Sequence, residues 1–128
     1  MFDHLGLSVR DLAESTRFYE TVLRPLGFEQ TSDTPELVEF GALSLSAEEP
    51  VTAPVHFAFL ARTREAVDAF HRAGVEAGYR DNGAPGIREY AEDYYAAYLL
   101  DPDGHNVEAV HRDPEERASW SWIRWNSA

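Results

Sequence analysis

The sequence predicts an α+β fold built from two β-α-β-β-β modules in a single domain. An internal repeat indicates two modules, because residues 2–7 match residues 54–59 and place His4 and His56 at the same point of each copy. In each copy, alternating apolar and polar side chains are followed by a stretch with the helical period, which is typical of a strand leading into a helix. The length of 128 residues suits one domain with its own core.

The first module is expected over about residues 1–47. Residues 3–9 alternate, which predicts a half-buried strand with His4 on the face of small side chains. Asp11 can cap a helix that runs to about Arg24, where Pro25 ends it. Three short apolar runs separated by turn residues then predict a strand meander. These runs are residues 27–31, 37–40 and 43–46.

The second module is expected over about residues 55–111, after a polar, proline-marked linker over residues 48–54. Its first strand contains His56 among smaller neighbours, and a helix follows that Gly74 or Gly78 can end. The remaining chain, residues 112–128, is a C-terminal extension. The elements expected in this module are strands at 55–60, 78–80, 94–100 and 106–111, a helix at 64–73 and a loop at 81–86.

Composition excludes several classes of function. Eleven arginines, no lysine and 23 acidic residues give a net charge of −12, which repels nucleic acid and anionic membrane surfaces. Without lysine there is neither Schiff-base chemistry nor a P-loop, and without cysteine there is neither a disulfide framework nor a thiolate nucleophile. Nothing resembles a signal peptide or a spanning segment, so we expect a cytoplasmic protein.

His4, His56 and Glu108 are the candidate metal ligands. Two neutral imidazoles and a carboxylate form a set that a divalent transition metal accepts. A histidine on a strand is more often structural than a ligand, and Glu108 could instead be an exposed carboxylate on an edge strand. An inward Glu108 would need a metal or a cationic partner, so its environment decides between these interpretations. The other histidines are left outside the site; they are His71, His105 and His111.

Two stretches of the chain resemble a known superfamily. Residues 96–108 look like its terminal strand-turn-strand ending in a carboxylate ligand, and residues 3–12 look like its opening strand and helix. The family is the vicinal oxygen chelate superfamily, which includes glyoxalase I, bleomycin-resistance proteins and extradiol dioxygenases. The resemblance implies a cupped mixed sheet with helices on the outer face. It also implies that His4, His56 and Glu108 bind iron, manganese, nickel, cobalt or zinc inside the cup.

The resemblance further implies a divalent-metal-dependent enzyme of the lyase/isomerase or dioxygenase type. Such an enzyme binds a small substrate through neighbouring oxygens and stabilises an enolate-like or oxygenated intermediate. Residues 41–46 offer no carboxylate for the fourth ligand of glyoxalase I, so a three-ligand site is expected. Tyr98 fits the spacing of the dioxygenase signature and would donate a hydrogen bond or proton to a bound oxygen. Candidate substrate-binding residues on the nearby loop and strand are Asn82, Arg88 and Tyr90.

Two other functions remain open. A metal-free small-molecule binding protein of the bleomycin-resistance type would use the same cup, and an acidic chain suits a cationic ligand. A structural or interaction role would instead bury the histidines. Three tryptophans in the C-terminal extension are too apolar for a free tail, so we expect them to cover the domain or a partner subunit and favour a homodimer. They are Trp120, Trp122 and Trp125.

Overall fold

The computed structural model describes residues 2–112, which form two β-α-β-β-β modules. The first comprises β1 (Leu5–Ser8), α1 (Leu12–Leu23), the 3-10 turn η1 (Arg24–Leu26), β2 (Ser32–Asp33), β3 (Leu37–Phe40) and β4 (Leu43–Ser46). The second comprises β5 (His56–Leu60), α2 (Arg64–Glu76), β6 (Arg80–Arg88), β7 (Tyr94–Leu100) and β8 (Asn106–His111). The predicted α+β class and the two modules are confirmed. The tryptophans of the C-terminal extension lie outside the described residues.

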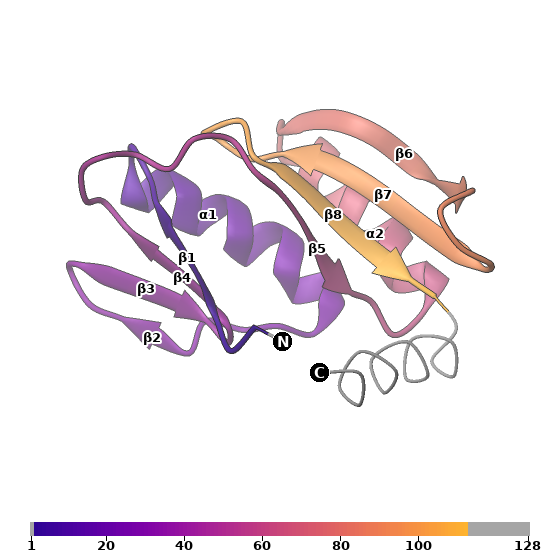
Figure 1. Ribbon diagram of the computed structural model, residues 1–128, viewed down its shortest axis with the longest axis horizontal. Helices are drawn as coiled ribbons and strands as arrows, with labels where there is room; N and C mark the ends of the chain where they lie inside the picture. The colour runs from indigo at the N-terminus through magenta and orange to yellow at the C-terminus, as the bar shows by residue number, and fades with distance from the viewer. Residues whose placement is uncertain (1, 113–128) are drawn as a thin grey trace, which may run out of the picture.

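Each module forms a four-stranded mixed sheet. The strand orders are β1-β4-β3-β2 and β5-β8-β7-β6, so the first strand of each module is an outer strand that pairs in parallel with the last. All other pairs are antiparallel. Figure 1 shows the two sheets side by side with α1 and α2 behind their strands, and the connection from β4 to β5 passing along the top of the first module to reach the second.

The helix boundaries follow from local chemistry. Asp11 and Thr63 cap the two helices, because their side-chain oxygens accept the backbone N–H of Glu14 at 3.1 Å and of Ala66 at 3.0 Å. Gly78 adopts φ +93° just after α2, a left-handed conformation that favours glycine at a helix end. The predicted Asp11 cap and the predicted helix end at Gly78 are therefore confirmed, whereas the Thr63 cap was not predicted and Gly74 lies inside α2.

Two predicted boundaries are wrong. The segment 81–86, expected as a loop, lies inside the outer strand β6, whose register shifts around Gly83 and Gly86. Glycine and proline are tolerated there because a bulged edge strand needs fewer ladder hydrogen bonds. The run 27–31 is not a strand either, and the first strand after η1 is the two-residue β2.

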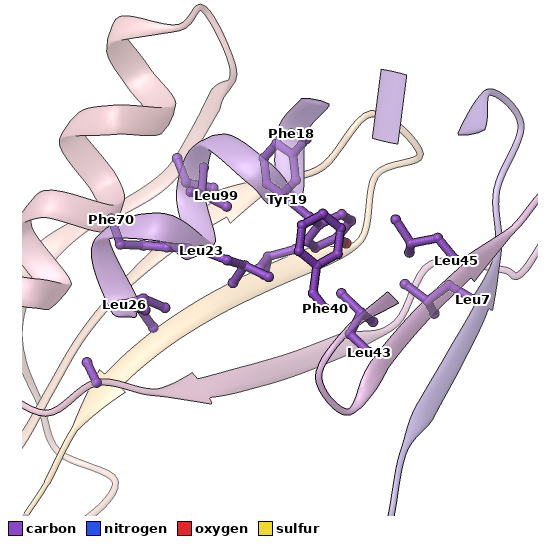
Figure 2. Close-up of a cluster of buried hydrophobic side chains, with 14 of the residues drawn as sticks. Leu7, Phe18, Tyr19, Leu23, Leu26, Phe40, Leu43, Leu45, Phe70 and Leu99 are labelled. Carbon is purple, nitrogen blue, oxygen red and sulfur yellow. The ribbon is translucent and has the colours of Figure 1, made fainter. Parts of the chain in front are cut away.

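A continuous core joins the modules. It lies between the helices and the sheets and includes aromatic and aliphatic side chains from both halves (Figure 2). Its fully buried members include Phe18, Tyr19, Val22, Leu23, Leu45, Val67, Phe70, Leu99 and Val107. Where the two helices meet, Gly74 of α2 leaves room for Leu99 and Val22, since a Cβ added there would come within 2.4 Å of Leu99 Cδ1. The modules thus share one apolar interior.

Buried polar contacts fix the turn between β7 and β8. The Tyr19 hydroxyl of α1 donates to Asp101 at 2.5 Å, which ties the first module to the second. Asp101 also accepts the backbone N–H of Asp103 and His105. His105 is fully buried, and its Nδ1 accepts the N–H of Val55 at 3.0 Å, just before β5. Within the described part of the chain, no helix is long and apolar enough to cross a membrane.

Candidate functional site

Glu108 is the centre of the candidate site. It lies on β8, between Ala58 of β5 and Tyr98 of β7, with which it is in register. Its side chain is 2% exposed, although it points away from the core residues that alternate with it on β8. The interpretation of Glu108 as an exposed carboxylate is therefore excluded.

Both carboxylate oxygens of Glu108 have partners. His56 Nε2 lies 2.7 Å from Oε1, and the Tyr94 hydroxyl donates to Oε2. The His56 side chain is 54% exposed, so in this pair the Glu108 carboxylate is buried and the His56 imidazole faces solvent. A buried carboxylate held by an imidazole can accept or return a proton, and the same nitrogen and oxygen donors suit a transition metal.

Two tyrosines keep their protons beside this carboxylate. Burial, followed by the hydrogen bond to Glu108, raises the pKa of Tyr94. Burial, the negative charge of Glu108 and nearby Tyr90 raise the pKa of Tyr98. The Tyr98 hydroxyl is buried and makes no hydrogen bond of regular geometry among the residues described, although Tyr90 lies close enough to it to raise its pKa.

Arginine and aromatic side chains border the site. The Arg88 guanidinium stacks 5.3 Å from the centre of the Tyr98 ring, and Arg88 also donates to the Ala84 carbonyl at 2.7 Å. Gly83 makes this close approach possible, because a Cβ there would lie 2.7 Å from Tyr98 Cδ2. Tyr90 is 73% exposed and packs edge-on against Tyr94. The stack of Arg88 on Tyr98 therefore forms a fixed wall beside Glu108.

Asn82 takes a different position from Arg88 and Tyr90. Its amide donates to the Asn106 side chain at 3.1 Å, bridging the strands at the other end of β6. Arg88 contacts Tyr98, and Tyr90 packs on Tyr94, the partner of Glu108. The structure therefore brings two of the three predicted substrate-binding residues toward Glu108.

His4 lies apart from the other two predicted ligands. It precedes β1, is 69% exposed and lies 2.8 Å from the Asp3 carboxylate through Nδ1. Among residues 2–112, no group of three His, Cys, Asp or Glu side chains is close enough to hold a metal ion. A single chain therefore assembles two of the three predicted ligands, His56 and Glu108.

Tyr94 is a contact of Glu108 that the sequence did not predict. A signal for it exists, because Tyr94 is four residues before Tyr98 on the same strand and so shares its face. Spacing alone favoured Tyr98, which is directly opposite Glu108. The longer diagonal reach of Tyr94 to the carboxylate depends on the twist of the strands, which a sequence pattern does not carry.

Comparisons with known proteins agree with this architecture. A family model described as the glyoxalase/bleomycin resistance protein/dioxygenase superfamily matches residues 1–109. The chain is similar to the crystal structure of a glyoxalase/bleomycin resistance protein from Albidiferax ferrireducens T118, with 32% identity and a TM-score of 0.73. That match covers 88% of this chain and 99% of the other.

Two further crystal structures share the fold. A lactoylglutathione lyase from Agrobacterium tumefaciens has 22% identity and a TM-score of 0.65, over 87% of this chain and 92% of its own. A glyoxalase-related enzyme from Fulvimarina pelagi has 21% identity and a TM-score of 0.68, over 88% of each chain. No curated protein matches the chain.

Proposed function

Because the chain belongs to the glyoxalase/bleomycin resistance protein/dioxygenase superfamily, we propose that it is a divalent-metal-dependent enzyme of the lyase/isomerase or dioxygenase type. Its substrate is a small molecule that presents two neighbouring oxygens. The observation that carries this proposal is the buried Glu108 carboxylate in contact with His56, whose other side faces solvent. The raised pKa values of Tyr94 and Tyr98 beside this carboxylate are perturbations of a kind that is typical of functional sites.

The donor set fits a metal in part. His56 Nε2 and Glu108 Oε1 already converge at 2.7 Å, and imidazole nitrogen with carboxylate oxygen suits iron, manganese, nickel, cobalt or zinc. When bound there, such a metal supplies a Lewis acid that polarises the substrate oxygens. Tyr94 would keep the Glu108 carboxylate in its orientation, as hydrogen bonds to ligating carboxylates do in metal sites.

The remaining residues would position the substrate. Tyr98 keeps its proton and has no hydrogen bond of regular geometry among residues 2–112, so it can donate to a substrate oxygen. The Arg88 guanidinium, stacked on Tyr98, would favour a substrate with negative charge next to that oxygen. Tyr90 would cover an apolar part of the substrate from the exposed side.

The third ligand would come from a second copy of the chain. β1 and β5 are each the outer strand of their sheet, which leaves one edge of each available to another strand except at Ser8, whose backbone N–H and C=O are both hydrogen-bonded to Thr52. Val55, just before β5, is 39% exposed. Pairing β1 of one copy with β5 of another would bring His4 toward His56 and Glu108. We therefore propose a homodimer whose site is shared.

Metal content tests the proposal. Protein loaded with iron, manganese, nickel, cobalt or zinc and then desalted is expected to retain stoichiometric metal, and His56→Ala and Glu108→Gln are expected to lose it. His71→Ala is the matched control. His71 lies on α2, and its imidazole also contacts a carboxylate, that of Asp81 on β6, at 2.9 Å. Absence of retained metal from the native protein with all five ions would contradict the metalloenzyme.

A mixing experiment tests the shared site separately. His4→Ala and Glu108→Gln proteins are each expected to retain no metal. Refolded together as one sample, they form mixed dimers in which one site is complete, so about one metal is retained for every four chains on random pairing. Recovery of no metal from the mixture, with dimers verified by light scattering, would place all ligands in one chain.

A metal-free binding protein is the second candidate. It is favoured by one observation, that both oxygens of Glu108 already have protein partners. In that case a cationic aromatic ligand would stack on Tyr90 and pair with the acidic chain. Saturable binding of such a ligand by protein that retains no metal after loading would support this candidate over the enzyme.

A further inference from the structure

A cavity opens between the two modules, where the parallel strands β5 and β8 end. Its volume is about 400 Å³, which is within the range of small-molecule sites. Residues from η1 and the chain just after it, from the end of β5 and its connection to α2, and from the end of β8 line it. They are Leu26, Gly27, Phe28, Leu60, Ala61, Arg62, His111 and Arg112.

One wall of this cavity is apolar and partly open to solvent. Phe28 is 37% exposed and Leu60 is 46% exposed, which is costly for side chains of this size without a partner. The Phe28 ring is held in place by Phe59, with ring centres 5.9 Å apart. Gly27 adds room beside them, because nothing lies within 4 Å of a Cβ placed there.

The polar side of the cavity is basic. Among the described lining residues there are two arginines and one histidine but no carboxylate, in a chain with a net charge of −12. Arg62 is exposed and makes no hydrogen bond or ion pair with the rest of residues 2–112. His111 Nδ1 donates to the Ala61 carbonyl at 2.9 Å, which leaves Nε2 as the ring nitrogen that can contact a ligand.

We propose that this cavity binds a small molecule with an apolar body and one anionic group, such as a carboxylate. The apolar body packs on Phe28 and Leu60, and the anion pairs with Arg62. The cavity adjoins the Glu108 site, because its lining residue Arg112 also lies over the Tyr94 ring at 5.6 Å, but its centre is displaced along the strands. His56 and Leu60 lie at opposite ends of β5, about 13 Å apart at roughly 3.3 Å per residue. The proposal does not depend on metal binding.

A ligand at this place would bridge the modules. Leu26 and Phe28 belong to the first module, whereas Leu60, Arg62 and His111 belong to the second. Since the ligand would bind only the folded arrangement, it is expected to raise the melting temperature in proportion to its occupancy.

Phenylacetate is a suitable probe, with phenethylamine and acetate as matched controls for charge and for the apolar body. In ¹H–¹⁵N spectra of the full chain, phenylacetate is expected to shift the amides of Gly27, Ala61 and Arg62 saturably and to raise the melting temperature. Neither control is expected to do so at the same concentration. Equal effects of phenethylamine, or no shift at these three amides, would overturn the proposal.

Substitutions identify the anion partner. Arg62→Gln is expected to weaken phenylacetate binding two- to five-fold, the range of an exposed ion pair of up to about 1 kcal/mol, and Arg62→Glu more strongly. Arg72→Gln on the exposed side of α2 is the control and should leave binding unchanged. Because Arg62 is exposed, these variants are expected to fold. Binding that is the same in Arg62→Gln, Arg62→Glu and the control would refute the assignment.

Discussion

A carboxylate buried as deeply as Glu108 is stable only with partners that replace water. It has two, the imidazole of His56 and the hydroxyl of Tyr94, one on each oxygen. Leaving one oxygen of a buried charge without a partner costs more than an ordinary hydrogen bond contributes. The residues around Glu108 therefore determine both the stability of this sheet and the chemistry of its exposed face.

Tyr94→Phe tests this arrangement. The variant is expected to lose about 1–3 kcal/mol of unfolding free energy, because one oxygen of Glu108 loses its donor. Tyr98→Phe is the control, since its hydroxyl makes no regular hydrogen bond within the described chain, and its effect should be smaller. Chemical denaturation measures both values. Equal losses in the two variants would contradict the assigned role of Tyr94.

Alkaline pH is expected to destabilise the protein. Burial raises the pKa of Tyr94 and Tyr98, whereas tyrosines of the unfolded chain titrate near pH 10. Below about pH 10 both states keep these protons and stability does not depend on them. Above it the unfolded chain releases protons that the folded state retains, so the free energy of unfolding falls as pH rises. Denaturation at pH 8 and pH 11 measures the change, and tyrosinate absorbance at pH 11 should be lower before unfolding than after.

At the residue scale, alternation in the sequence predicted part of the site. It placed His56 and Glu108 on the same kind of face, and the structure brings them into contact. The alternation could not show whether His4 lies beside His56 and Glu108, because that depends on how the two sheets are placed relative to each other. No local pattern contains that information, since the relevant contacts lie between modules.

The helices and strands have the predicted boundaries where the hydrophobic periodicity and the capping residues indicate the same element. The helix after Asp11 and the strands Tyr94–Leu100 and Asn106–His111 have the predicted boundaries. The strand predicted at 78–80 extends in the structure as β6 to Arg88, and most of it was missed because residues 81–86 have the composition of a loop. Pairing with β7 keeps β6 extended, although the residues of β6 have little strand propensity of their own. The tertiary contact therefore outweighs the local preference of this segment.

Gly74 provides a test at the level of helix packing. Helix propensity alone predicts that Gly74→Ala stabilises the protein by up to about 1 kcal/mol. The structure predicts the opposite, a loss of about 1–3 kcal/mol, because the new Cβ would meet Leu99 Cδ1 within the fully buried core. A double-mutant cycle with Leu99→Val checks the cause, since the shorter side chain should recover part of the loss. A stabilised Gly74→Ala variant would contradict this packing.

The whole molecule is held together across its internal repeat. The core is continuous between the modules, and Tyr19 of the first reaches Asp101 of the second at 2.5 Å. We expect the described part of the chain to behave as one cooperative unit, although its sequence reads as two copies of one pattern.

Cooperative unfolding is the corresponding prediction. Thermal unfolding of the full chain should give one transition, with the same midpoint by far-UV circular dichroism and by the tyrosine bands of the near-UV circular dichroism spectrum. Tyr19→Phe should lower the stability by about 1–3 kcal/mol, because Asp101 loses a buried donor, without splitting the transition. Two separated transitions in either protein would show that the modules unfold independently.

The parallel pairing of β5 with β8 determines when the site can form during synthesis. β5 is the first strand of its module and β8 the last, so His56 has to wait until residue 108 has left the ribosome before it meets Glu108. The chain between β5 and β8 is a long loop that this pairing has to close. The pairing therefore forms more slowly than the short hairpin between β7 and β8. The candidate site is therefore completed at the end of folding, and a chain stopped before β8 presents His56 on an unpaired strand edge open to aggregation.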